Sequence, residues 1–97
     1  MKKIIWSQKA INSLQRLVHF IDKKWNRSVA DKLLDEIEKT LERIAFNPFL
    51  YPVYSQKKNL RRCVIKKKTI LFYRVVEEKI EIILLVDARQ NPANFKL

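Results

Sequence analysis

Basic side chains are the residues of this chain best placed to do chemistry, and many of them fall in one stretch. Between Lys57 and Lys68 there are seven basic residues and no acidic residue. They are Lys57, Lys58, Arg61, Arg62, Lys66, Lys67 and Lys68. Such a cluster can neutralise phosphate oxygens or bind an acidic protein surface. The stretch therefore predicts an anionic partner, although a solvated face and a hairpin tip rich in lysine are the structural alternatives.

A further cation, Arg89, directly follows the longest apolar run of the chain, in the segment Asp87-Ala88-Arg89-Gln90-Asn91-Pro92. Residues that follow a buried strand are well placed for function, because the strand holds them rigidly. We therefore expect Arg89 to be functional. A structural salt bridge with Asp87 is the alternative role.

Several kinds of chemistry are excluded by residues that the chain lacks. It has no glycine, and Cys63 and His19 are its only cysteine and histidine. Phosphate-binding loops, dinucleotide fingerprints and nucleophile elbows all need glycine, and a zinc cluster or an intrachain disulfide needs more cysteine or histidine. We expect no metal and no cofactor, with Cys63 in the core and His19 on a helix surface.

Length and charge predict one small basic domain over residues 1–97. The net charge is +11, a value that bears on which partners the protein attracts rather than on its fold. Residues 1–48 hold ten basic and six acidic residues, a net charge of +4, whereas residues 49–97 hold eleven and four, a net charge of +7. No apolar run is long enough for a signal peptide or a membrane span, so we expect a soluble, cytoplasmic protein.

The elements that must position these cations follow from the apolar spacing. Residues 2–6 form a short predicted strand, and Ser7 is a good N-cap for a helix over 8–24. A second helix is predicted from Ser28, with Asp31 completing a capping arrangement, to a stop at Asn47-Pro48. Its apolar stripe is Ala30, Leu33, Leu34, Ile37, Leu41, Ile44 and Ala45. We expect the two helices to form an antiparallel hairpin.

The second half of the chain predicts an ordered loop over 47–59 followed by strands over 60–65, 70–76 and 80–87. The short turns between these strands make this part of the sheet antiparallel. Simple alternation places Ile80, Ile82, Leu84 and Val86 on one side of the last strand, and Ile83 and Leu85 on the other. Trp6 and Trp25 flank the first helix, and we expect both to pack rather than to bind bases.

In order and spacing, these motifs resemble the RelE/ParE superfamily of toxins from bacterial type II toxin–antitoxin systems. The resemblance runs nearly end to end and rests on several short motifs together. They are Trp6-Ser7, Ala10, Trp25, Ala30, Ile37, Asn47-Pro48, Tyr51-Pro52, Arg61-Arg62, Phe72-Tyr73-Arg74-Val75 and Asp87-Ala88-Arg89. It implies an α/β domain of the α+β type, with an N-terminal strand and a two-helix hairpin packed on a mainly antiparallel sheet of three to four strands.

The resemblance also implies a biological role and partners. Toxins of this kind inhibit growth and stabilise plasmids, and a cognate acidic antitoxin wraps and neutralises them. ParE-like members inhibit DNA gyrase as protein ligands, whereas RelE-like members cut mRNA in the ribosome without a metal. A homodimer and a toxin–antitoxin hetero-oligomer both stay open.

Two positions favour the ParE-like branch. Ile70 stands where RelE-like nucleases would have an arginine, and Phe95 stands where they would have a C-terminal tyrosine. Isoleucine cannot hold a phosphate, and phenylalanine cannot transfer a proton. We therefore predict a gyrase-binding toxin that is not an enzyme. The alternative is a metal-free endoribonuclease in which Arg89 and Lys67 are catalytic. The predicted target- or antitoxin-binding residues are Arg61, Arg62, Lys66, Lys67, Lys68, Arg89 and Phe95.

Overall fold

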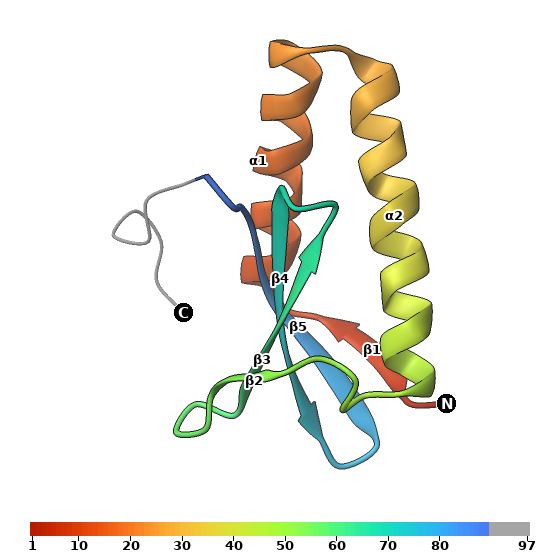
Figure 1. The fold of residues 1–97 in the computed structure, drawn as a ribbon, viewed down its shortest axis with the longest axis vertical. Helices are drawn as coiled ribbons and strands as arrows, with labels where there is room; N and C mark the ends of the chain where they lie inside the picture. The colour runs from red at the N-terminus through yellow and green to blue at the C-terminus, as the bar shows by residue number, and fades with distance from the viewer. Residues whose placement is uncertain (90–97) are drawn as a thin grey trace.

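The computed structural model describes residues 1–89, which form two helices and one mixed sheet of five strands (Figure 1). The elements in chain order are β1 (Lys3–Trp6), α1 (Gln8–Lys24), α2 (Arg27–Phe46), β2 (Val53–Ser55), β3 (Leu60–Ile65), β4 (Thr69–Val76) and β5 (Lys79–Asp87). The sheet order is β1-β5-β4-β3-β2. Strand β1 runs parallel to β5, and the other pairs are antiparallel. The α+β class is confirmed, but the predicted strand number of three to four is too low.

Strand β2 is the element that the sequence did not predict. Only Val53–Ser55 are extended, and a register shift interrupts their pairing with β3. Three residues are too few to show an alternating pattern, and Pro52 just before them is typical of a loop. The rest of the segment 47–59 is the connection that was expected.

The helix hairpin begins at two side-chain caps. The Ser7 hydroxyl accepts a hydrogen bond of 3.0 Å from the Ala10 N–H, as predicted, and α1 has the predicted bounds. For α2 the prediction is wrong by one residue: the helix begins at Arg27, and the cap is Asn26, whose amide oxygen accepts from the Val29 N–H at 3.0 Å. Asn26 has the extended backbone that lets a short polar side chain reach the first turn. Neither helix is long and apolar enough to cross a membrane.

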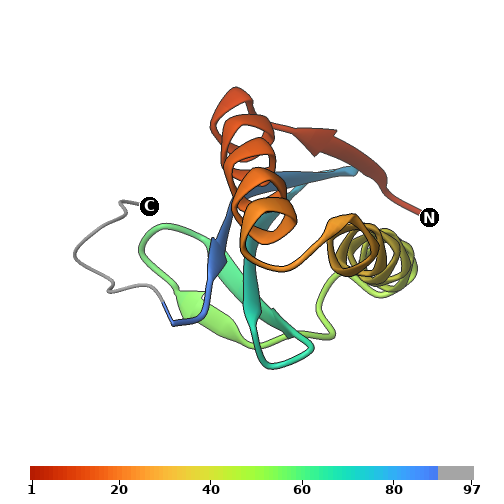
Figure 2. The ribbon, with the colours of Figure 1, turned by 90° about the horizontal axis from the view of Figure 1, so that it is seen from above.

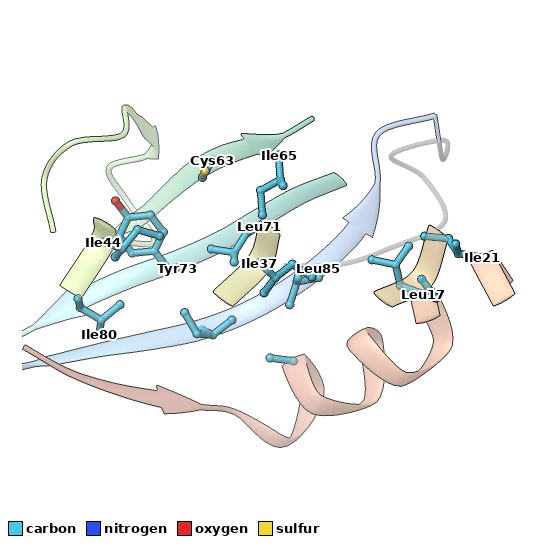
Figure 3. Close-up of a cluster of buried hydrophobic side chains, with 13 residues drawn as sticks. Leu17, Ile21, Ile37, Ile44, Cys63, Ile65, Leu71, Tyr73, Ile80 and Leu85 are labelled. Carbon is cyan, nitrogen blue, oxygen red and sulfur yellow. The ribbon is translucent and has the colours of Figure 1, made fainter. Parts of the chain in front are cut away.

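Both helices cover the same face of the sheet, as the view from above shows (Figure 2). The main core lies between them and the sheet, and Cys63 and Tyr73 are buried within it (Figure 3). Leu34 was predicted in this core but is exposed. Thr40, about a turn and a half further along α2, is buried instead. Its hydroxyl donates to the Glu36 carbonyl at 2.8 Å, so this buried polar group has a hydrogen-bond partner within the helix. His19 is exposed on α1, as expected.

A bulge in β5 changes which side chains face the helices. Phe72 pairs with Leu84, but the next residue, Tyr73, pairs with Ile82, so Ile83 is an extra residue in the ladder. The predicted strict alternation is therefore wrong beyond Ile82, because a bulge inserts one residue and reverses the faces that follow. Ile80, Ile82 and Leu85 lie in the core under the helices, whereas Leu84 and Val86 join Phe72 in a small cluster on the other face.

Ser7, the cap of α1, and Ser13 within α1 form hydrogen bonds with backbone groups of β5 near and beyond the end of β1. The Ser7 N–H donates to the Ile82 carbonyl at 3.1 Å, and the Ser7 hydroxyl donates to the Ile83 carbonyl at 3.3 Å. Further along, the buried Ser13 hydroxyl accepts from the Leu85 N–H at 3.0 Å. These bonds fix the end of β5, which carries Asp87 and leads to Arg89.

Candidate functional site

The site that contains Arg89 is a groove at the joined ends of the two helices. It has a volume of about 540 Å³ and lies between this end of the hairpin and the turn from β3 to β4. Its apolar lining includes Ile21, Trp25, Leu33 and Ile65. Its charged lining includes Glu36, Lys66, Lys68, Asp87 and Arg89. We call it the basic groove, since its cations include three of the predicted binding residues.

Arg89 is held by Asp87 at one side of the basic groove. Its Nε and Nη2 atoms donate to the two carboxylate oxygens of Asp87 at 2.9 and 2.7 Å, and its backbone N–H donates to the same group at 2.8 Å. The Arg89 guanidinium lowers the pKa of the Asp87 carboxyl from its ordinary value, chiefly through these hydrogen bonds. The side chain of Asp87 is mostly buried and that of Arg89 is half-exposed. The salt bridge weighed as a structural alternative is therefore present.

Aromatic rings border Arg89. Its guanidinium carbon is 5.4 Å from the centroid of the Trp25 ring, and the Lys24 ammonium is 4.9 Å from the same centroid. Phe20 meets Trp25 edge to face at a centroid distance of 6.4 Å. Trp25 packs on Phe20 within the helix hairpin and stays 43% exposed, whereas Trp6 packs against the core. In the sequence, the signal for this cluster was two large aromatic residues, Phe20 and Trp25, close to Lys24 at the end of the first helix.

The three lysines form the turn between β3 and β4. Lys66 and Lys67 have φ values of 53° and 62°, and the Lys68 N–H donates to the Ile65 carbonyl at 3.1 Å. Two successive positive φ values are typical of a type I′ hairpin turn, which favours Asn-Gly. The Lys66 ammonium is 3.8 Å from a Glu36 carboxylate oxygen, a pairing across the groove that the sequence did not reveal.

Arg61 and Arg62 lie at the other end of β3, away from the basic groove. Lys66 is five positions beyond Arg61, about 16 Å along an extended strand. Arg61 pairs with the buried Tyr73, and its Nη1 donates to the Tyr51 carbonyl at 2.7 Å. Arg62 points to the opposite face, where its guanidinium carbon is 5.6 Å from the centroid of the Tyr54 ring. The single predicted basic patch is therefore divided into two regions.

Comparison with known proteins identifies the family. A model described as the ParE toxin of the type II toxin–antitoxin system, parDE, matches residues 4–92. The chain belongs to the ParE toxin family. A search of curated proteins finds no match.

Solved structures show that the ParE fold extends over nearly the whole chain. A structure titled chromosomal ParDE toxin–antitoxin system from P. aeruginosa aligns with a TM-score of 0.78 at 15% identity, and covers 92% of this chain and 98% of that one. The solution structure of a conserved hypothetical protein from Helicobacter pylori aligns with a TM-score of 0.61 at 20% identity, and covers 90% and 94% of the two chains. At these identities the likeness shows the fold alone.

Ile70 and Phe95 are the two positions that favoured the ParE-like branch in the sequence. Ile70 lies beside Phe72, Leu84 and Val86, on the face of the sheet opposite the helices. Ile70 is not among the residues that line the basic groove. Phe95 lies outside the described residues. In residues 1–89, no group of three or more histidine, cysteine or acidic side chains could hold a metal ion.

Proposed function

We propose that this ParE family member is a toxin that inhibits DNA gyrase by binding to it, and that an acidic antitoxin neutralises it. Family membership supports the toxin role. The net charge of +11 supports an acidic antitoxin, because charge complementarity steers association and selects partners.

The hydrogen bonds between Arg89 and Asp87 are the observation that favours binding over catalysis. A guanidinium that stabilises a transition state must have free donors directed at the reacting phosphate. Two donor atoms of Arg89 are instead directed at Asp87, whose negative charge offsets its own. Three of its five N–H donors stay free, but a phosphate would meet a guanidinium whose charge the carboxylate already offsets. This arrangement argues against a phosphate clamp at Arg89, and so favours a toxin that acts by binding over one that acts by catalysis.

A supercoiling assay tests the proposal. Purified toxin added to gyrase, ATP and relaxed plasmid should stop the appearance of supercoiled product at a toxin concentration near that of the enzyme. Relaxation of the same plasmid by a type I topoisomerase is the control, and should proceed normally because the toxin does not act through the DNA. Full supercoiling at tenfold toxin excess would contradict the proposal.

Ribosome-dependent RNA cleavage is the second candidate, and the basic groove gives it a specific basis. Glu36 lines the groove together with five cations, Lys32, Lys39, Lys66, Lys68 and Arg89, so a carboxylate lies among cations there. In a translating extract this candidate predicts cut transcripts, and loss of cutting in the folded variants Arg89→Ala and Glu36→Gln. Intact transcripts at inhibitory toxin concentrations would exclude it.

A further inference from the structure

Large apolar side chains are exposed from the last residue of α2 to the first residue of β2. Phe46 is 74% exposed, Phe49 61%, Leu50 50% and Val53 47%. We call these four residues the aromatic loop surface. Single exposed apolar residues are ordinary, but a group of them within eight consecutive positions is typical of a site that another molecule covers.

The backbone under these side chains is pinned to the sheet. The Tyr73 hydroxyl donates to the Pro48 carbonyl at 2.7 Å, and Arg61 donates to the Tyr51 carbonyl at 2.7 Å. The Arg62 N–H donates to the Pro52 carbonyl at 3.1 Å. Figure 1 shows the loop crossing from the end of α2 to the edge of the sheet. The loop is therefore ordered by three bonds that leave its apolar side chains outside.

The inward side chains of the same segment strengthen this anchoring. Tyr51 packs against the main core, and its hydroxyl lies by Cys63 and Arg43. Burial raises the pKa of Tyr51 above its ordinary value and that of Tyr73 to about 12. Both hydroxyls are protonated at neutral pH, so Tyr73 keeps the proton that it donates to Pro48. A preordered loop loses little conformational entropy on binding, which favours affinity.

The charge around the loop defines the chemistry of its partner. Residues 46–55 carry no charged side chain, and the arginines Arg43, Arg61 and Arg62 lie beside them. The Arg61 guanidinium carbon is 4.9 Å from the centroid of the Phe49 ring, so a cation and an exposed aromatic are adjacent. Aromatic residues and arginine dominate the binding energy of protein interfaces. The complement is an acidic protein segment that carries a large apolar side chain.

We infer that the aromatic loop surface is where the toxin binds its protein target, through an acidic segment of that target with an apolar anchor between Phe49 and Leu50. The surface lies at the opposite end of β3 from the basic groove, so contact with the target does not use Arg89. This inference rests on the proposed function, because it names the surface through which gyrase is bound.

The test compares two double variants in which only exposed side chains are shortened. Phe49→Ala with Leu50→Ala removes the centre of the surface. Ile11→Ala with Leu34→Ala is the matched control, since Ile11 and Leu34 are each 37% exposed on the helices. Binding to immobilised gyrase and inhibition of supercoiling are measured for both, with thermal melting as the check on folding. The loop variant should bind at least about tenfold more weakly than the unchanged toxin, and the control should bind normally.

The outcomes separate this inference from the proposed function. Failure of the unchanged toxin to inhibit gyrase would overturn both. Inhibition by the unchanged toxin and equally by the folded loop variant would overturn the surface alone. Loss of antitoxin binding with gyrase inhibition retained would assign the loop to the antitoxin, and a toxin dimer that dissociates in the variant would assign it to a second copy. Either result would also overturn the inference.

Discussion

At the scale of single residues, the turn between β3 and β4 holds two lysines in a backbone conformation that lowers stability. Lys66 and Lys67 both have positive φ, a conformation in which a side chain costs roughly 1 kcal/mol and glycine costs little. Glycine is absent from the whole sequence, so the turn gains two cations at the expense of stability. Strain of this kind is typical of functional positions.

Replacing Lys67 with glycine should therefore stabilise the fold. We expect Lys67→Gly to raise the free energy of unfolding by about 1 kcal/mol, because the strain at φ 62° is relieved. Urea denaturation measures the change. Lys68→Gly is the control, since Lys68 is not among the residues with positive φ, and its substitution should give no gain. A loss of stability in Lys67→Gly would contradict the argument.

The Asp87–Arg89 pair predicts a dependence of stability on acid. The folded pKa of Asp87 is lowered below the unfolded value of about 3.9. The pair therefore contributes stability that is fully present above about pH 4 and is lost as the pH falls through the folded pKa. Arg89 is half-exposed, so solvent screens the pair and the contribution should be small.

Urea denaturation of Asp87→Asn and the unchanged protein from pH 7 to pH 2 tests this dependence. The variant should be less stable at pH 7, and the difference between the two proteins should shrink below about pH 4. Arg89→Ala should show the same profile, and the double variant should lose no more than either alone. A difference that stays constant with pH would show that Asp87 acts through packing instead.

At the scale of elements, the end of β5 depends on α1. Beyond Ile82 the strand has no β1 partner, and the Leu85 N–H is satisfied by the Ser13 hydroxyl. Ser13 also donates to the Ala10 carbonyl at 2.8 Å, so its hydroxyl serves as both donor and acceptor in the core. Helix and strand are thus joined at the point from which Asp87 and Arg89 are positioned.

Removing the Ser13 hydroxyl should be costly. Ser13→Ala leaves the buried Leu85 N–H without a partner, and should lower the free energy of unfolding by about 2 kcal/mol. Ser28→Ala is the matched control: Ser28 is exposed and Asn26 provides the cap of α2, so its loss should change stability by less than about 0.5 kcal/mol. Equal effects of the two substitutions in denaturation experiments would contradict this account.

At the scale of the whole molecule, the fold places its excess positive charge in two regions. The basic groove collects Lys66, Lys68 and Arg89, whereas Arg61 and Arg62 lie beside the aromatic loop surface. Two separate surfaces allow a toxin to contact a target with one and an antitoxin with the other. The excess positive charges also repel one another in the folded state.

Added salt should consequently stabilise the isolated toxin. We expect the free energy of unfolding in urea to rise by roughly 1 kcal/mol between 20 and 300 mM sodium chloride, because the ions screen the repulsion. The double variant Lys67→Gln and Lys68→Gln keeps the turn but removes two charges, and should show a smaller rise. Stability that is independent of salt would show that the charges are too far apart to interact.

The sequence by itself determined most of the elements and predicted the class of partner. The spacing of apolar residues placed both helices to within a residue or two. It also placed four of the five strands closely, all except β2, because these signals are local. The absence of glycine argued against phosphate-binding loops, dinucleotide fingerprints and nucleophile elbows. The excess of Lys and Arg predicted an anionic partner, and short motifs indicated the family that the comparison confirmed.

Only the tertiary structure decided how the functional side chains are combined. The bulge at Ile83 reversed the faces of β5, and β3 carried Arg61 away from Lys66. Pairing over long separations placed Glu36 beside Lys66 and pinned the loop at Pro48 to Tyr73. Asp87 was weighed as a partner of Arg89 from the sequence, but its geometry came from the end of β5. Such contacts depend on strand register and helix docking, which the whole core sets together and no local pattern records.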